Sequence, residues 1–69
     1  MAKILVIDDD RSICETLELY LTEEGYEVHT ALTGTDGLNK FVQFQPDLVI
    51  LDIRLPDIDG FTVLEEIRE

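Results

Sequence analysis

The pattern of hydrophobic positions predicts three β-strands. Two of them are continuous apolar runs with many β-branched residues, Ile4–Ile7 and Leu48–Leu51. Such runs are typical of parallel strands that are buried on both faces. With their flanking residues they give strands over 3–8 and 47–52. The remaining strand, Tyr26–Ala31, alternates between polar and apolar residues, which favours a place at the edge of the sheet.

Three helices are predicted from apolar residues that recur at helical spacing. The first covers approximately 11–24, the second lies between the second and third strands, and the third covers approximately 60–68. Their apolar stripes are Ile13, Leu17, Tyr20 and Leu21; Leu38, Phe41 and Val42; and Phe61, Leu64 and Ile67. The residues expected to cap or end the first two helices are Asp10 and Gly25, and Thr33 and Asp36 with Gln45-Pro46. Gly37 costs about 1 kcal/mol relative to Ala, so we expect a loose first turn in the second helix.

The order of these elements, β-α-β-α-β-α, predicts an α/β fold with a parallel sheet. Parallel strands need long crossover connections, and the right-handed rule packs each connecting helix on a face of the sheet. Two buried strands and one edge strand suit the spatial order 2-1-3, in which the first and third strands are neighbours. The third strand has the sequence of a central strand, although nothing after Glu69 covers its outer side.

Length, charge and cysteine content narrow the class of protein. A chain of 69 residues makes one small domain, which is marginal without a partner, a metal or a disulfide. Cys14 is the only cysteine, and we interpret it as a small buried helix residue rather than a reactive thiol. With no secretory segment and no apolar run near the ~20 residues of a membrane helix, we expect a cytoplasmic protein. A net charge of −11 argues against direct contact with nucleic acid or an anionic membrane.

Carboxylates follow both of the buried strands. Asp8, Asp9 and Asp10 come after the first, and Asp52 ends the third. Because ligands bind at the carboxyl ends of parallel strands, we expect these acidic side chains to converge. Mg²⁺ prefers oxygen ligands and would offset their repulsion. Asp52 is then the candidate nucleophile, with Asp9 and Asp8 as metal ligands and an aspartyl phosphate as product. In the competing interpretation the aspartates merely cap helices and turns.

Two stretches resemble the receiver domain of two-component response regulators: ILVIDDD at 4–10 and DLVILDIRLPDIDG at 47–60. The resemblance covers all 69 residues and implies a flavodoxin-like, three-layer parallel sheet. It implies that Asp52 accepts a phosphoryl group from the phosphohistidine of a sensor histidine kinase. It further implies that Mg²⁺ is bound directly by Asp9, through water by Asp8, and by the backbone carbonyl of Arg54.

Receiver domains are nearly twice as long as this chain. We therefore expect residues 1–69 to be the N-terminal half of a receiver, truncated before strands four and five. The other half would carry a switch Ser/Thr and a Lys that pairs with the phosphoryl group. We expect no enzymatic activity beyond slow self-catalysed phosphorylation of Asp52. We also expect the bare edge of the third strand to associate with another copy or with a complementary half. Transcriptional control is the commonest output implied by the family.

Alternatives from other classes remain at this point. The first is an inert folding or design fragment of a receiver. The second is a calcium loop, since Asp57, Asp59, Gly60 and Glu66 match four positions of an EF-hand loop. However, Leu55 stands at the first position of that loop, where a ligand is required. The third is a phosphatase with Asp8 and Asp10 as a D-x-D pair, which needs a longer chain. We expect His29 to face solvent, because it has no Cys or His partner for a metal site.

Overall fold

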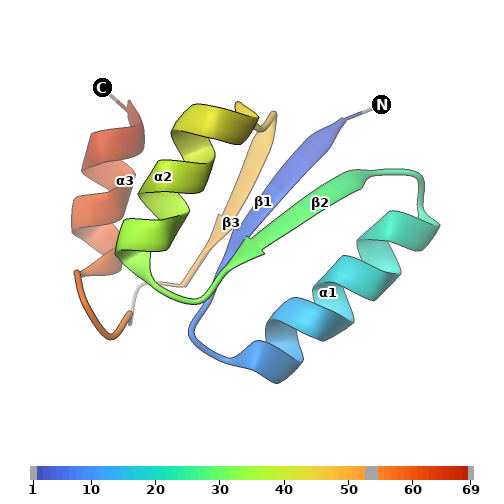
Figure 1. Ribbon diagram of the computed structural model, residues 1–69, viewed down its shortest axis with the longest axis horizontal. Helices are drawn as coiled ribbons and strands as arrows, with labels where there is room; N and C mark the ends of the chain where they lie inside the picture. Colours follow the sequence, from blue (N-terminus) through green and yellow to red (C-terminus); the bar gives the residue numbers. More distant parts are fainter. Residues whose placement is uncertain (1, 53–54, 69) are drawn as a thin grey trace.

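The computed structural model describes residues 2–52 and 55–68 of the chain. It confirms the predicted order of strands and helices (Figure 1). The elements are β1 (Lys3–Ile7), α1 (Arg11–Glu23), β2 (Glu27–Ala31), α2 (Gly34–Phe44), β3 (Leu48–Leu51) and α3 (Gly60–Arg68). None of these helices has both the length and the apolarity that crossing a membrane requires.

The three strands form one parallel sheet in the order β2-β1-β3, as predicted. In the central strand β1, Ile4–Ile7 are all buried, with exposed fractions of 3% or less. The register sets Ile7 opposite both Ala31 of β2 and Leu51 of β3. The three strands therefore end at the same level, which brings the loops that follow them together at the carboxyl ends of the strands.

Helices cover the two faces of the sheet unequally. Helix α1 packs on β1 and β2 from one side, while α2 packs on the same strands from the other side and carries α3 against it (Figure 1). Because side chains alternate along a strand, Ile4 and Val6 join the α1 layer with Cys14. Leu5 and Ile7 join the opposite layer with Phe44 and Val63. The chain is a three-layer α/β unit.

Within the described residues, the structure confirms that β3 has a bare outer side, as the order 2-1-3 implies, but the burial on both faces predicted from its sequence is wrong. Among the described strands β3 pairs with β1 alone, and Leu48 is 54% exposed. Its apolar residues reach the core only on the side that faces β1 and the neighbouring helices, where Val49 and Leu51 pack against the buried cluster. The strand therefore has the composition of an interior strand at the position of an edge strand.

Some of the predicted helix stripes are rotated relative to the faces that are buried. In α1, Cys14 is buried while Ile13 and Tyr20 are exposed. In α3, Val63 is fully buried, whereas Phe61 and Leu64 are exposed. The reason is that each of these helices packs against the rest of the fold through a narrow strip of its surface. Apolar residues beside that strip remain exposed to solvent. Val42 of α2, 72% exposed, follows the same rule.

Gly37 has a packing role rather than a loosening one. A Cβ atom at this position would lie 2.6 Å from Cδ1 of Ile7, whose side chain is fully buried. Glycine therefore lets α2 approach β1 closely. The helix ends as predicted, at Gln45, which adopts a left-handed conformation with φ of 52°.

Candidate functional site

The acidic residues after β1 and β3 lie side by side because the two strands pair in register. The N–H of Asp52 donates to the carbonyl of Ile7 at 2.9 Å, and the N–H of Asp8 donates to the carbonyl of Ala31 at 3.0 Å. These two hydrogen bonds extend the parallel ladders by one residue beyond the strand ends. The hydrogen bonds of the sheet therefore fix the backbone of Asp8 and Asp52 at the carboxyl ends of the strands.

Asp8, Asp9 and Asp52 form a cluster of three carboxylates. One oxygen atom from each lies within 4.8 Å of the other two. Asp8 and Asp52 are half-buried and Asp9 is exposed. The three line an open depression together with Asp10 and Ile13. It is the one group of potential metal ligands found among residues 2–52 and 55–68.

The chemistry of the donor set fits a hard divalent cation. Oxygen ligands of Mg²⁺ lie at about 2.1 Å from the ion, so opposite ligands are about 4 Å apart. Carboxylate oxygens within 4.8 Å match that spacing with small side-chain rotations or intervening water. Like charges this close raise one another's free energy unless a cation lies between them. The arrangement can thus hold a cation and leave a carboxylate oxygen of Asp52 near it.

Asp10 caps α1, as predicted. Its Oδ1 accepts hydrogen bonds from the N–H groups of Ser12 at 2.9 Å and Ile13 at 3.3 Å. Asp8 in turn accepts the N–H of Asp10 at 2.9 Å. The turn after β1 is therefore held by its own aspartates, and capping accounts for the position of Asp10.

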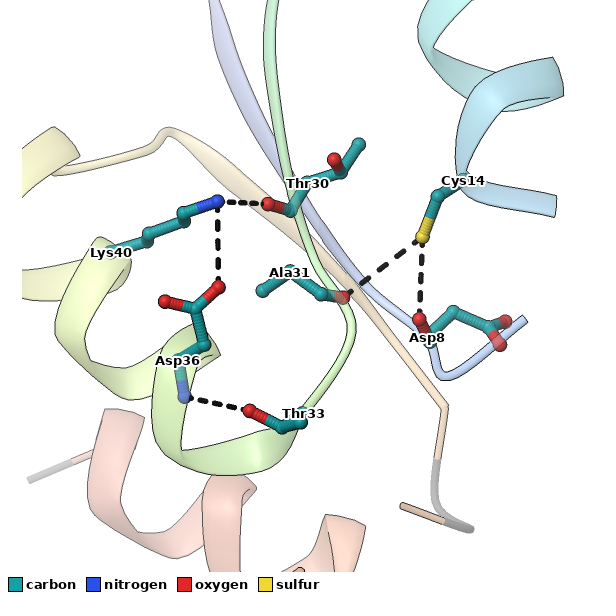
Figure 2. A network of polar contacts seen from close by, with 7 residues as sticks. All are labelled: Asp8, Cys14, Thr30, Ala31, Thr33, Asp36 and Lys40. Carbon is teal, nitrogen blue, oxygen red and sulfur yellow. Dashed lines mark hydrogen bonds and ion pairs between the residues drawn. The ribbon is translucent and has the colours of Figure 1, made fainter. Parts of the chain in front are cut away.

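Cys14 supports the same turn from inside the fold. Its Sγ donates to the backbone carbonyl of Asp8 at 3.3 Å and points toward that of Ala31 at 3.9 Å (Figure 2). Burial, followed by the nearby charge of Asp8, raises the pKa of the Cys14 thiol. A thiol that stays protonated is a poor nucleophile, which agrees with the prediction of a buried structural cysteine.

Two aspartates of the calcium-loop alternative are engaged in capping helices. Asp57 accepts the N–H groups of Gly34 at 2.7 Å and Thr35 at 2.9 Å, at the start of α2. Asp59 accepts the N–H of Phe61 at 2.9 Å, at the start of α3. Hydrogen bonds from the side chain and then the backbone of Thr35 hold the pKa of Asp57 well below its usual range. The sequence analysis missed the contact between Asp57 and α2.

His29 lies on β2, away from the carboxylate cluster. Its imidazole stacks on the ring of Phe44, with centroids 3.7 Å apart, and its Nε2 lies 3.9 Å from a carboxylate oxygen of Glu27. The side chain is about half exposed, so the prediction of a solvent-facing histidine holds for one side of the ring. The ligand role expected for the backbone carbonyl of Arg54 lies outside the described residues.

Comparison with known proteins gives concordant matches. The family model of the response regulator receiver domain matches residues 4–69. The transcriptional regulatory protein AfsQ1 of Streptomyces coelicolor is 48% identical over 68 residues, which cover 99% of this chain and 30% of that protein. A CheY-like receiver domain protein from Methanospirillum hungatei superposes with a TM-score of 0.96 at 38% identity, over 99% of this chain and 54% of that one.

A second solved relative carries ligands and a partner. The response regulator TrrA of Thermotoga maritima, in complex with Mg²⁺ and BeF, has a TM-score of 0.92 and 51% identity, over 99% of this chain and 59% of TrrA. Another structure contains TrrA with the histidine kinase ThkA. This chain thus spans slightly more than half of the solved receivers and less than a third of the curated relative.

Proposed function

The chain belongs to the response regulator receiver domain family, and from that premise we propose that it is a phosphoacceptor in two-component signalling, phosphorylated on Asp52. The observation that carries the proposal is the cluster of carboxylate oxygens from Asp8, Asp9 and Asp52 within 4.8 Å of one another. Asp52 is assigned as the nucleophile because it alone follows β3, whereas Asp8 and Asp9 both follow β1.

Asp8 and Asp9 are proposed to hold Mg²⁺ beside Asp52, with the backbone carbonyl of Arg54 as a further ligand by family resemblance. All of these donors are oxygens, which suits the ion. When bound, Mg²⁺ supplies positive charge that offsets the repulsion between the carboxylates and an incoming phosphoryl group. The related TrrA in complex with Mg²⁺ and BeF supports this assignment.

In the proposed reaction, a carboxylate oxygen of Asp52 attacks the phosphorus atom of a phosphohistidine. The new O–P bond forms as the P–N bond breaks, and the electron pair of the broken bond stays on the imidazole nitrogen, which takes up a proton from water. Asp8 and Asp9 would hold the cation beside Asp52, and the cation would supply the positive charge and positioning on which phosphoryl transfer chiefly depends. The product is an aspartyl phosphate in the open depression at the carboxyl ends of the strands.

A sensor histidine kinase is the proposed phosphoryl donor. The related TrrA is found in complex with the histidine kinase ThkA. We also propose a part in transcriptional control, which the name of the related regulatory protein AfsQ1 states for that protein, and with it a cytoplasmic location. The net charge of −11 makes direct contact of this domain with nucleic acid unfavourable, so DNA binding is assigned to another part of such a regulator.

Residues 1–69 are proposed to correspond to the N-terminal half of a receiver, before its fourth and fifth strands. In the family these strands carry a Lys and a Ser/Thr that stabilise and report the phosphoryl group. The chain alone would then supply the nucleophile and the metal ligands without the full charge clamp, so its self-catalysed phosphorylation should be slow. The alternative proposal, an inert fragment, predicts no phosphorylation at all.

Treatment with acetyl phosphate and Mg²⁺ tests the phosphoacceptor. We expect mass spectrometry to detect addition of one phosphoryl group to the chain, lost in Asp52→Asn and retained in Asp47→Asn. The control residue lies at the opposite end of β3, where its carboxylate accepts the N–H of Lys3 at 2.8 Å. No addition to the unsubstituted chain, or equal addition to Asp52→Asn, would favour the inert fragment.

The exposed edge of β3 is proposed to pair with a second copy or with a complementary half. The other edge of the sheet is blocked, because Lys40 donates to the outward carbonyl of Thr30 on β2 and is held by Asp36 at 3.5 Å (Figure 2). Within the described part of the chain, no hydrogen bond reaches the outer side of Leu48–Leu51. A bare apolar edge is a template for strand pairing.

A further inference from the structure

The loop that follows the phosphoacceptor is tied to a helix that lies earlier in the chain. Asp57 places both carboxylate oxygens on the first turn of α2: Oδ1 accepts the N–H of Gly34 at 2.7 Å, and Oδ2 accepts the N–H of Thr35 at 2.9 Å. Thr33 Oγ1 accepts the next free N–H, that of Asp36, at 3.0 Å. The unpaired N–H groups at the start of α2 are thus shared between a local cap and a carboxylate from another loop.

Packing reinforces this connection. Ile58 lies so close to Gly34 that a Cβ atom on the glycine would overlap Cγ1 of Ile58 and lie 2.8 Å from its Cδ1. Oδ1 of Asp57 also accepts the N–H of the next residue, Ile58, at 2.9 Å, which fixes the carboxylate relative to its own backbone. Leu55 and Ile58 both pack against the core cluster under α2 and α3. The side chains of the loop therefore fit one position relative to α2.

The same loop is anchored at its other end within the carboxylate cluster. The N–H of Asp52 donates to the carbonyl of Ile7 at 2.9 Å, so the start of the loop moves with β1. Five residues later, Asp57 fixes it to α2. Asp52 and Asp57 are thus each held by another part of the fold, Asp52 by β1 and Asp57 by α2.

We propose that Asp57 is a positioning residue for the metal site, and that its attachment to α2 sets the affinity of the Asp8, Asp9 and Asp52 cluster for a divalent cation. The inference rests on the proposed function. It assigns to the start of α2 an effect on a site to which that helix contributes no ligand. Groups that hydrogen-bond directly to metal ligands commonly change metal affinity by about 10–100-fold. Asp57 contacts Gly34, Thr35 and Ile58 rather than a ligand, so its effect through the loop should be smaller.

Mn²⁺ binding provides the test, with the free ion measured by electron paramagnetic resonance and Mg²⁺ as competitor. We expect Asp57→Asn to lower the affinity measurably, though by less than about 10-fold, and Asp47→Asn to leave it nearly unchanged. Both variants lose one charge and a carboxylate that accepts backbone hydrogen bonds, but Asp47 lies at the far end of β3.

A second pair of variants leaves the charge untouched. Gly34→Ala should displace Ile58 and weaken Mn²⁺ binding, although no carboxylate is altered. The double variant Gly34→Ala/Ile58→Ala removes the overlapping atoms and should recover most of the affinity. Circular dichroism of each variant reports whether it is folded. If Gly34→Ala does not fold, the comparison of Asp57→Asn with Asp47→Asn decides the question.

The possible results separate the two proposals. If the unsubstituted chain binds no Mn²⁺, the proposed metal site is wrong and this inference is wrong with it. If the chain binds Mn²⁺ and folded Gly34→Ala or Asp57→Asn binds as tightly as the Asp47→Asn control, the positioning role of Asp57 is overturned while the metal site stands.

Discussion

At the scale of single residues, Asp57 is held in its ionised form by its surroundings. Hydrogen bonds from the side chain and backbone of Thr35, then from the N–H groups of Gly34 and Ile58, lower the pKa of its carboxyl group. A carboxylate at the start of a helix is also favoured by the helix dipole. The protonated form would lose these interactions, so the contact depends on pH.

The free energy of unfolding should therefore show an acid-dependent contribution from Asp57. Because the pKa is lower in the folded state, this contribution is complete above the ordinary aspartate pKa of about 3.9. It is lost as the pH falls from there through the lower folded pKa. We expect the stability difference between the unsubstituted chain and Asp57→Asn, measured by urea unfolding, to be constant near neutral pH and to shrink below about pH 4. A difference of the same size at every pH would contradict this.

Residues differ in how much of their role the sequence reveals. Asp10 caps the helix that directly follows it, which local sequence predicts. Asp8, Asp9 and Asp52 directly follow apolar strands, and this pattern predicted that their carboxylates lie close together. Asp57 caps a helix that begins 23 residues earlier. Nothing in the neighbouring sequence of Asp57 encodes that partner, because the contact depends on how α3 and its loop pack against α2.

At the scale of elements, the close contact between α2 and β1 depends on Gly37. Its backbone faces the fully buried side chain of Ile7. In an exposed helix, replacing Gly by Ala would stabilise by about 1 kcal/mol. Here the added methyl group meets three atoms of the fully buried Ile7 side chain at 3.0 Å or less, and overpacking of a core typically costs about 1–3 kcal/mol.

Gly37→Ala should therefore destabilise the chain, by about 1 kcal/mol after the gain in helix propensity is included. Urea unfolding of the single variants and of Gly37→Ala/Ile7→Val measures the effect. Because valine lacks the Cδ1 atom that lies closest, the double variant should lose less stability than the sum of the two single changes. Stabilisation by Gly37→Ala alone would show that α2 can shift away from β1.

Helical spacing identified each helix but not always its buried face. Leu17, Leu21, Leu38, Phe41 and Ile67 pack against the core as expected. Ile13, Tyr20, Val42, Phe61 and Leu64 do not. Periodicity reports which residues share a side of a helix, whereas burial depends on which neighbouring element lies against that side.

At the scale of the whole molecule, the two edges of the sheet differ. Lys40 occupies the outward carbonyl of Thr30 at the β2 edge, whereas β3 ends the sheet with an exposed leucine, Leu48. Strand order was predictable because it follows from crossover rules and strand composition. The composition of β3 is that of an interior strand, and this chain spans slightly more than half of the related receiver from Methanospirillum hungatei.

Association through β3 predicts a response to charge at that edge. Leu48→Lys should shift sedimentation at micromolar concentration toward the monomer, because a lysine at a strand edge opposes pairing. Val42→Lys is the matched control: it adds the same charge at an exposed apolar residue, but on α2. A clean monomer in the unsubstituted chain, or equal sedimentation of both lysine variants, would contradict pairing through β3.

The stack between His29 and Phe44 supplies a spectroscopic probe of the packing of α2 on the sheet. His29 is the single histidine of the chain, and its ring lies flat against a phenylalanine at the end of α2, with an interplanar angle of 9°. The ring current of Phe44 should therefore shift the imidazole proton resonances upfield. Their return to free-histidine positions would reveal, in one resolved region of a proton spectrum, when α2 has detached from the strands.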